Sequence, residues 1–462
     1  TIGLHAADTR RLLAILRRLA DRGNTVVVVE HDPEAIESAD HVIDLGPGAG
    51  SQGGRLLFEG TPRALARVAD SATGELLRRR SRRPSEIRGP SPGAPASKRV
   101  VPFRRAEGTI TIVGANQNNL RDLTVRIPLG RMVSIAGVSG SGKSTLMRDI
   151  LHHAYARRIK GATQFDVGAH DRIEGLESIS DLLLVDQTPL GRSARSNPVT
   201  YTKAWDEIRR LFASSSRAAS RGITARDFSF NSAGGRCEAC RGTGWQTIDM
   251  QFLADVVVRC DACDGRRFQS RVLAVRLRGK NIDDVLEMTV EDAAAFFASE
   301  EKIVRRLEPL LEAGLGYMRL GQPTATLSGG EAQRLRLAAF LGIRSAASRG
   351  VLFLFDEPTT GLHARDVDRL LGTLRRLISR GHSVLAVEHH LGFLEASDWI
   401  IELGPGGGSA GGRIVAEGTP EEIARNSKSL TGRFLADPRA MGGAMEGSAA
   451  DSRIDDHRDR RG

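Results

Sequence analysis

The segment "GVSGSGKS", residues 137–144, combines glycines, a lysine and a serine at the spacing of a phosphate-binding loop. It follows an apolar stretch and precedes a helical pattern, so its backbone N–H groups are expected to approach phosphate oxygens at a strand-to-helix turn. Lys143 is expected to reach the β and γ phosphates, and Ser144 to bind Mg²⁺. The predicted chemistry is binding of a magnesium–nucleoside triphosphate, with these candidate ligands in the loop: Gly137, Gly140, Gly142, Lys143, Ser144 and Thr145.

Two adjacent carboxylates end a second apolar stretch, in "GVLFLFDEPTTGLH". A carboxylate at the C-terminal end of a buried strand is suited to bind Mg²⁺ beside a phosphate loop, and Asp356 takes that role. Glu357 is then placed to orient or deprotonate the attacking water. His389 follows the apolar residues 384–387 and is expected near the γ-phosphate. A lone histidine is more often structural, but its recurrence as His31 after an equivalent stretch favours function.

A further glycine-rich helix start lies in "TATLSGGEAQRLRLAAFL". Ser328, Gly329 and Gly330 open this helical pattern and are suited to bind a second phosphate group. Together with Gln187 in "LLLVDQTPLGRS", these motifs resemble, in kind and order, those of the ATP-binding-cassette (ABC) ATPases. The resemblance implies that Gln187 belongs to the catalytic set with Glu357 and His389. It also implies that the signature helix of one cassette completes the nucleotide site of another.

The four cysteines have a spacing that is typical of a metal site. They form two C-x2-C pairs separated by nineteen residues: Cys237, Cys240, Cys260 and Cys263. A disulfide framework is the alternative, but two C-x2-C knuckles in a chain expected to be cytosolic favour zinc. Four thiolates leave no open coordination position, so we expect a structural zinc ion that stabilises a small insertion.

Buried strands must position these residues, and an internal repeat shows how the strands are organised. The apolar stretches before the phosphate loop, the carboxylates and His389 are expected to be buried strands, with the reactive residues at one sheet edge. Residues 3–62 match residues 361–420 without a gap, at an offset of 358 positions (3 to 361). The helical pattern near the N-terminus and the apolar residues 26–29 are therefore expected to be a helix and a buried parallel strand of a partial cassette.

Composition excludes some classes of protein. The 462 residues are 40% hydrophobic and 26% charged, which suits a globular chain of two or three domains. No apolar run approaches the roughly 18 residues of a membrane span, and no signal peptide is apparent, so we expect a cytoplasmic protein. Much of the net charge of +10 lies in residues 78–105, which hold ten Arg or Lys, one Glu and five prolines. This segment is expected to be disordered, either as a solubilising tether or as a phosphate-binding linker.

The segments "VDQTPLGRSARSNPVTYTKAWDEIRRLFA", "FSFNSAGGRCEAC" and "LSGGEAQRLRLA" make the resemblance more specific. An ABC cassette interrupted by this cysteine module is similar to the second half of the excinuclease proteins of the UvrA family. The likeness covers residues 109–435, and residues 3–62 resemble the end of the family's first cassette. It implies an α/β fold: a P-loop ABC-type cassette with a helical signature subdomain and a zinc-binding insertion, preceded by a partial α/β cassette.

The resemblance implies a damage-sensing ATPase of nucleotide excision repair that uses ATP, Mg²⁺ and Zn²⁺. Its expected partners are damaged double-stranded DNA, a second copy or a missing N-terminal half, and a UvrB-like helicase, with no membrane. A damage sensor reads shape and deformability through phosphate contacts, which requires basic residues on a rigid platform. Arg192 and Arg195 rank first because the matching family segment is implicated in DNA contact. Further candidates are Arg209, Arg210, Arg236, Arg259, Arg266 and Arg267.

The expected organisation places a remnant of a first cassette at 1–70 and a basic linker at 71–108. The second cassette spans 109–435, with the zinc module at about 228–270 and the signature region at about 271–345. A disordered tail follows at 436–462. The chain is expected to be a fragment or one of two split polypeptides, and a UvrA-like self-resistance ATPase acting on drug-modified DNA remains an alternative. A catalytically incomplete fragment is another, while the cysteine insertion and the lack of apolar membrane segments in the sequence disfavour a transporter or translation-factor ABC ATPase.

Overall fold

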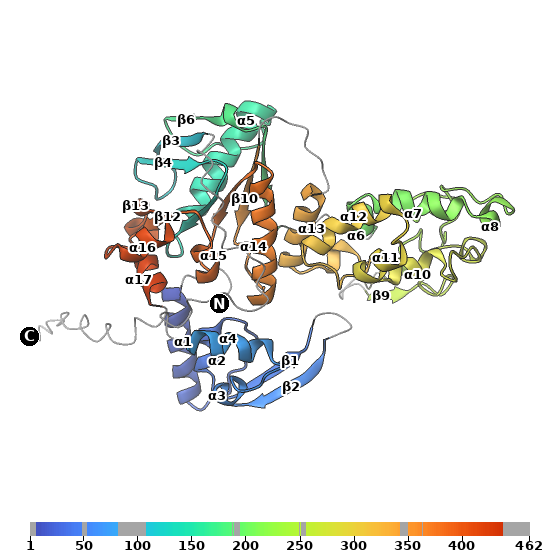
Figure 1. Ribbon diagram of the computed structural model, residues 1–462, viewed down its shortest axis with the longest axis horizontal. Helices are drawn as coiled ribbons and strands as arrows, with labels where there is room; N and C mark the ends of the chain where they lie inside the picture. Colours follow the sequence, from blue (N-terminus) through green and yellow to red (C-terminus); the bar gives the residue numbers. More distant parts are fainter. Residues whose placement is uncertain are drawn as a thin grey trace, which may run out of the picture.

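The computed structural model describes residues 6–48, 53–81, 108–186, 188, 195–248, 250, 256–341, 350–362 and 364–437. Gln187, Arg192, linker residues 82–107 and the tail from residue 438 lie outside these ranges. Among the described residues, no helix combines the length and apolar character needed to cross a bilayer. Figure 1 shows a central α/β body, a mainly helical region projecting from it, and a smaller N-terminal module beside it.

A six-stranded sheet forms the centre of the α/β body. Its four inner strands consist largely of apolar residues, which suits strands that are covered on both faces. All neighbouring strands pair in parallel except the edge pair β12 and β13. The spatial order is β13 (Arg413–Gly418), β12 (Trp399–Gly404), β5 (Met132–Ala136), β11 (Ser383–Val387), β10 (Val351–Asp356) and β7 (Asp181–Val185).

Helices and a second sheet cover the two faces of the central sheet. On one face, the helix after the phosphate loop packs with an antiparallel sheet ordered β4 (Leu123–Pro128), β3 (Thr109–Ala115), β6 (Arg172–Glu174). That helix is η3 (Thr145–His152), a π-helical segment that continues as α5 (His153–Lys160). On the other face, α14 (Ala364–Ser379) and α13 (Gly329–Leu341) contribute to a separate apolar core. Shorter elements are η4 (Leu176–Ser178), α15 (Leu391–Glu395), η6 (Gly408–Ala410), α16 (Pro420–Arg425) and α17 (Leu430–Ala436).

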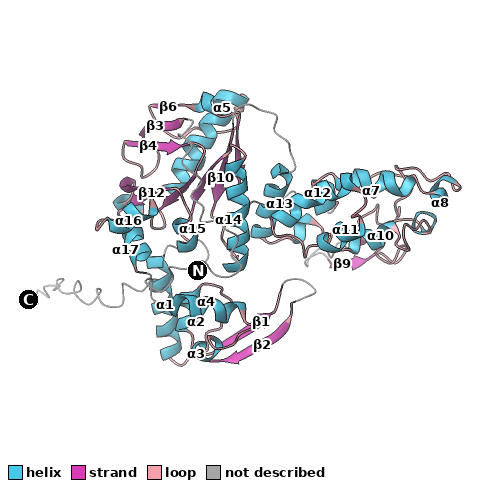
Figure 2. Cartoon of the chain, in the orientation of Figure 1, coloured by secondary structure: helices cyan, strands magenta, loops and turns pink. Residues whose placement is uncertain are grey.

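The projecting region has its own core, and apart from one hairpin it is largely helical (Figure 2). Fully buried aromatic side chains dominate that core: Phe212, Phe228, Phe230, Phe268 and Phe297. The hairpin consists of β8 (Trp245–Ile248) and β9 (Val256–Arg259). The helices are α6 (Pro198–Tyr201), α7 (Ala204–Ala213), α8 (Ser216–Ala219), α9 (Ser270–Leu273), α10 (Ile282–Glu287), α11 (Val290–Phe296), α12 (Glu301–Glu312) and η5 (Thr324–Thr326).

The N-terminal module repeats the C-terminal part of the α/β body at the offset of 358 positions. Its elements are α1 (Ala6–Asp21), α2 (Pro33–Ser38), β1 (Val42–Gly46), β2 (Arg55–Gly60), α3 (Pro62–Leu65) and α4 (Ala72–Ser81). Helix α1 corresponds residue for residue to α14, and β2 corresponds to β13. Both hairpins contain a bulge at the same place, between Asp44 and Leu45 and between Glu402 and Leu403.

A buried carboxylate extends the repeat beyond the match seen in the sequence. Asp44 accepts hydrogen bonds from Ser71 Oγ (2.6 Å) and Thr73 Oγ1 (2.9 Å). At the matching positions, Glu402 accepts hydrogen bonds from Ser429 Oγ and from the Thr431 backbone N–H (2.8 Å). These bonds fix the start of the last helix of each unit, so the first part of the predicted linker 71–108 is folded as α4.

The expected buried strand at residues 26–29 is not formed, and this prediction was wrong. These residues pair with no strand among the described residues, and their side chains are exposed. The matching residues of β11 lie between β5 and β10, which supply hydrogen bonds on both sides. An apolar sequence becomes a parallel strand only where neighbouring strands are present, and the described N-terminal module supplies none.

Glu402→Ala is expected to lower the free energy of unfolding by about 1–3 kcal/mol, because the Ser429 hydroxyl and the Thr431 N–H lose a buried acceptor. Urea denaturation of the purified chain measures this loss. Glu417→Ala, at an exposed position of β13, is the matched control and should be nearly neutral. Equal effects of the two substitutions would contradict a structural role for the buried carboxylate.

Candidate functional site

The phosphate-loop segment forms a tight turn between β5 and η3. Gly137 has φ of 130°, and a Cβ atom there would lie 2.0 Å from the Leu403 carbonyl oxygen, so only glycine fits. Asn119 Nδ2 donates to the carbonyl oxygens of Gly140 (2.9 Å) and Gly408 (3.0 Å). The loop is therefore held from outside, by the segment before β4 and by the glycine-rich segment after β12. Ser144, at the start of η3, is exposed.

Lys143 is buried within the loop. Its Nζ donates to the carbonyl oxygens of Gly137 (2.9 Å) and Val138 (2.8 Å). Burial lowers the pKa of Lys143 to about 8, against the opposing effect of nearby carboxylates, of which Glu357 is the largest contributor. An anion bound next to this ammonium would favour its charged form, so the position suits a phosphate ligand.

The two carboxylates lie at the end of β10, level with the end of β11, because Asp356 pairs with Val387. Asp356 Oδ2 accepts a hydrogen bond from Arg148 of η3 at 2.8 Å, and burial raises the pKa of this carboxyl group. Hard cations prefer such carboxylate oxygens, so Asp356 and the exposed Ser144 are suited to hold Mg²⁺.

Glu357 and His389 face each other across this edge. The distance from His389 Nε2 to Glu357 Oε1 is 3.6 Å, and hydrogen bonding to His389 lowers the pKa of Glu357. Glu357 itself has φ of 49°, in the left-handed region that non-glycine residues rarely adopt. A strained residue at the edge of a sheet suits a group whose direction matters for chemistry. The structure thus brings Lys143, Asp356, Glu357 and His389 to one site.

Two buried residues that support the site, Glu388 and Gln333, were not predicted from the sequence. Glu388, which is buried, accepts hydrogen bonds from the backbone N–H groups of Thr359 (2.8 Å) and His389 (2.8 Å), joining the segments after β10 and β11. Gln333 of α13 is also buried, and its Nε2 donates to the carbonyl oxygens of Val185 (2.9 Å) and Asp356 (3.3 Å). The recurrence of Val-Glu-His pointed to Glu388, whereas no sequence signal separates Gln333 from other helical residues.

The predicted signature residues are arranged by a hydrogen-bonded cap at the start of α13. Glu331 Oε2 accepts from the Ser328 backbone N–H (2.9 Å) and hydroxyl (3.1 Å), and Glu331 Oε1 accepts from Tyr317 (2.7 Å). Gly329 and Gly330 begin the helix, and a Cβ atom on Gly330 would lie 3.2 Å from the Thr360 carbonyl oxygen. These hydrogen bonds therefore fix the conformation of the helix start, where Gly329 and Gly330 add no side chains.

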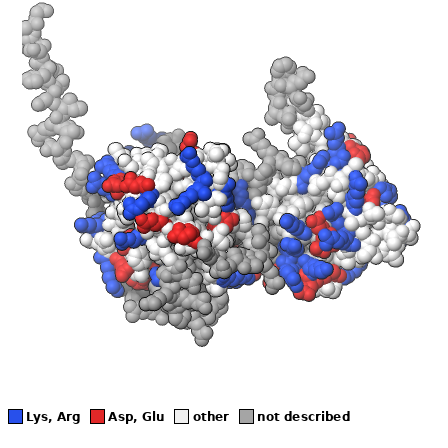
Figure 3. Space-filling model, turned by 90° about the horizontal axis from the view of Figure 1, so that it is seen from above, with Lys and Arg blue, Asp and Glu red and all other residues white. Residues whose placement is uncertain are grey.

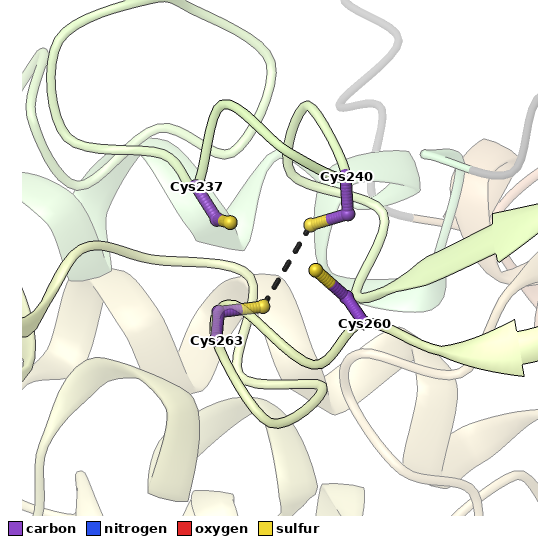
Figure 4. A group of neighbouring side chains, drawn as sticks. All are labelled: Cys237, Cys240, Cys260 and Cys263. Atoms are coloured by element: carbon purple, nitrogen blue, oxygen red, sulfur yellow. Dashed lines mark hydrogen bonds between the residues drawn. The ribbon is translucent and has the colours of Figure 1, made fainter.

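The four cysteines converge on one point (Figure 4). Their sulfur atoms lie within 4.8 Å of one another, and Cys240 Sγ is 3.7 Å from Cys263 Sγ. Four sulfurs at about 2.3 Å from a central tetrahedral zinc ion are separated by roughly 3.8 Å, so the cluster fits this metal. Burial raises the pKa of the Cys237 and Cys263 thiols, so without a cation their thiolates are disfavoured.

Glycine-rich turns build both cysteine knuckles. The backbone N–H of Gly242 donates to the Cys237 carbonyl (3.1 Å), and the N–H of Gly265 donates to the Cys260 carbonyl (3.2 Å). Both glycines have positive φ. The Gly244 N–H also points at Cys240 Sγ (3.3 Å), an interaction that stabilises a thiolate ligand.

Arg267 joins the cysteine module to the helical region and is not a surface cation. It is buried, its guanidinium donates to the Gly321 carbonyl (3.1 Å), and its own carbonyl accepts from Cys237 N–H (2.8 Å). The prediction that Arg267 contacts DNA was therefore wrong, because its guanidinium is buried and hydrogen-bonded inside the protein.

The other basic candidates lie nearer the surface, and several of them pair with acids. Arg195 is half-buried, and Arg192 lies outside the described residues. Figure 3 shows basic and acidic side chains interspersed over the projecting region at the right. The pairs are Arg209 with Asp206, Arg210 with Glu207, Arg236 with Glu238, and Arg259 and Arg266 with Asp264.

Together, a P-loop parallel sheet, carboxylates at its strand ends and an inserted helical signature region define the class of ABC-type ATPase cassettes. No protein-family model matches the chain. Curated relatives nevertheless identify it: the UvrABC system protein A of Mycobacterium tuberculosis is 48% identical over 453 residues, which are 98% of this chain and 45% of the relative. That of Methanothermobacter thermautotrophicus is 49% identical over 437 residues, 94% of this chain and 44% of the relative. The chain belongs to the UvrA family.

A solved structure agrees with this assignment. The crystal structure of UvrA2 from Deinococcus radiodurans is 46% identical and matches with a TM-score of 0.82, covering 94% of this chain and 50% of that chain. The present chain thus spans about half the length of the relatives that it matches. The expected α/β fold with an ABC-type cassette is confirmed, and the cysteine cluster is compatible with the expected zinc site.

Purified chain is expected to contain about one zinc ion, and Cys240→Ser is expected to lose it, because three thiolates no longer close the tetrahedral site. Elemental analysis after gel filtration measures the metal content. Ser270→Ala, at an exposed position near the cluster, should retain the ion. Four freely titrating thiols in a metal-free native chain would rule out the metal centre.

Proposed function

We propose that the chain is an ATP-dependent DNA-damage-recognition component of nucleotide excision repair. The similarity to UvrABC system protein A over 98% of the chain is the observation that carries this proposal. The gathering of Lys143, Asp356, Glu357 and His389 supports it, because a binding module without turnover does not need a water-directing carboxylate beside a phosphate site.

In the proposed reaction, ATP binds along the phosphate loop. Lys143 and the loop N–H groups hold its phosphates, with Gly137, Gly140, Gly142 and Thr145 completing the loop. Ser144 and Asp356 would hold Mg²⁺, and the bound ion would neutralise charge on the phosphates. Glu357 orients the attacking water and accepts its proton, while His389 keeps the Glu357 carboxylate ionised and directed. Gln187 joins this set on family resemblance.

The signature residues Ser328, Gly329 and Gly330 act on a nucleotide held by another cassette. That assembly is either a homodimer or a complex with an N-terminal half of the protein. The capped start of α13 supports this role, because the hydrogen bonds between Ser328 and Glu331 fix the position of a helix N-terminus, which attracts phosphate groups.

The proposed ligand of the assembly is damaged double-stranded DNA. Damage differs in chemistry, so recognition depends on shape and on phosphate contacts rather than on base edges. Arg192 and Arg195, which lie in the sequence between β7 and α6, are the proposed contacts. A UvrB-like helicase is the proposed partner in a cytoplasmic repair pathway, on the basis of the family alone.

The proposed domain division follows the function. Residues 1–70 together with α4 are the end of a first cassette, the rest of residues 71–108 is a linker, 109–435 is the second cassette and 436–462 is a tail. Within the second cassette, the zinc module spans about 228–270 and the signature region about 271–345. The position of Arg267 between cysteine cluster and helical core supports treating these two parts as one rigid platform.

Glu357→Gln is expected to bind ATP but to hydrolyse it at least about 100-fold more slowly, because the phosphate and Mg²⁺ ligands remain while the proton acceptor is lost. Phosphate release measures turnover, and a fluorescent nucleotide measures binding. Glu421→Gln, at an exposed position of α16, is the control and should behave as the unmodified chain. Undiminished turnover of Glu357→Gln would reject the role of this carboxylate.

Binding to duplex DNA is expected to weaken steeply with salt, with a log–log slope of roughly 0.9 per phosphate neutralised, and to favour a bulky lesion over intact DNA. Replacing Arg192 and Arg195 by alanine together should weaken binding and lower that slope. The matched control replaces Arg126 and Arg172, exposed on the antiparallel sheet, and removes the same charge elsewhere. Fluorescence anisotropy measures the binding. A chain that starts at residue 107 is used, so that the basic linker cannot contribute to the measured affinity. If that chain fails to bind, or if both double variants weaken binding equally, the proposed DNA platform is wrong.

A further inference from the structure

A positively charged side chain contacts the carboxylate that is proposed to hold Mg²⁺. Arg148 Nη2 lies 2.8 Å from Asp356 Oδ2 and donates a charge-assisted hydrogen bond to it. Arg148 follows Ser144, the other proposed Mg²⁺ ligand, by four residues, and helical backbone runs from Ser144 into η3. Residues four apart lie on nearly the same side of a helix, so Arg148 approaches the proposed metal ligands from the helix that follows the phosphate loop.

Asp356 lies in a group of carboxylates. Burial raises its pKa, the positive charge of Arg148 opposes this rise, and the negative charges of Glu357 and Asp186 add to it. Among the described residues, Arg148 is the cation that forms an ion pair with Asp356. Carboxylates gathered at one partly buried position repel one another, so Asp356 needs a positive charge close to it.

The neighbouring charged groups have partners of their own. These contacts join Asp186 to Arg336, Glu357 to His389, and Lys143 to the carbonyl oxygens of Gly137 and Val138. Arg336 and His389 therefore face the other two carboxylates, and the Lys143 ammonium is directed at the loop. The charge of Asp356 is balanced by Arg148.

The contact with Asp356 leaves one polar atom of Arg148 unsatisfied. Arg148 Nε is buried and has no hydrogen-bond partner among the described residues, which costs part of the free energy gained from the ion pair. The Arg148 side chain as a whole is 38% exposed, whereas that of Asp356 is 19% exposed. A long basic side chain can move its charged end into water while its methylene groups stay packed. The guanidinium can therefore leave Asp356 without disturbing the buried apolar side chains of η3.

We propose that Arg148 is an exchangeable counter-ion of the nucleotide site. Its guanidinium neutralises Asp356 before nucleotide binds, and it leaves this carboxylate when ATP binds together with Mg²⁺. A guanidinium and a divalent cation held by one carboxylate repel each other at close range, so the two compete for Asp356. The inference rests on the proposed ATP site and goes beyond it, because it assigns to Arg148 the strength with which ATP binding depends on Mg²⁺.

Replacing Arg148 by methionine tests the proposal, because Arg148→Met removes the charge but keeps a long side chain. Without Mg²⁺, the unbalanced Asp356 carboxylate repels the phosphates of ATP, so the affinity falls. With Mg²⁺, no ion pair has to be broken, so the affinity does not fall. The ratio of the affinities with and without Mg²⁺ is therefore expected to rise about 10-fold above that of the unmodified chain, the effect of losing one charged hydrogen bond. Anisotropy of a fluorescent, non-hydrolysable ATP analogue measures both affinities, in excess EDTA and in saturating Mg²⁺.

Arg157→Met is the matched control, because it removes the same charge from an exposed position of α5, the helix that continues η3. Its affinity ratio should equal that of the unmodified chain. Thermal unfolding shows whether each variant is folded, and Arg148→Gln, which is expected to give the same rise, replaces Arg148→Met if the latter unfolds.

Two results decide against the proposal, and they are distinguishable. An affinity ratio that is unchanged or lower in the folded Arg148 variant overturns the inference and leaves the proposed ATP site standing. If the unmodified chain binds the analogue neither with nor without Mg²⁺, the proposed ATP site itself is wrong, and the inference falls with it.

Discussion

Parallel pairing of β5, β11 and β10 is the constraint on which the proposed nucleotide site depends. Strands that run in one direction bring all their carboxyl ends to one edge, so the phosphate loop, the carboxylates and His389 meet although they are distant in sequence. The register matters as much as the direction. A slip of one residue between β10 and β11 would separate Glu357 from His389 and turn the side chains of the strand to the opposite face.

The cysteine cluster and the nucleotide site are held by different parts of the molecule. The cluster is anchored through Arg267 to the aromatic core of the projecting region, whereas the proposed nucleotide site belongs to the central sheet. The two regions meet at α13, whose Gln333 bridges the ends of β7 and β10, and also at α14, whose Thr373 donates a hydrogen bond to the Glu312 carbonyl of α12. A displacement of α13 by the projecting region would therefore act directly on the sheet edge that carries Asp356.

Sequence patterns predicted those features that depend on local chemistry. The glycines of the phosphate loop, the strand before Asp356 and the paired cysteines each follow from residue types that few other structures require. Predictions failed where a neighbour decides the outcome. Residues 26–29 have strand composition but no strand beside them in the described part of the chain, and Arg267 is surrounded by cationic sequence yet is buried. The contacts of Arg148 with Asp356 and of Gln333 with Val185 link distant segments, which a single sequence does not reveal.

The central claim is that residues 137–144 and the carboxylates at the end of β10 form one nucleotide site. Titration calorimetry of ATP in the presence and absence of Mg²⁺ tests it most directly, with Lys143→Ala as the variant and Lys160→Ala, a half-exposed lysine on α5, as the control. The structure predicts that ATP binding depends on Mg²⁺. The ATP affinity is expected to fall about 10- to 100-fold in Lys143→Ala, because a charged hydrogen bond is lost. The affinity should be unchanged in Lys160→Ala. Equal ATP affinity in the unmodified chain and in Lys143→Ala would contradict the assignment of this site.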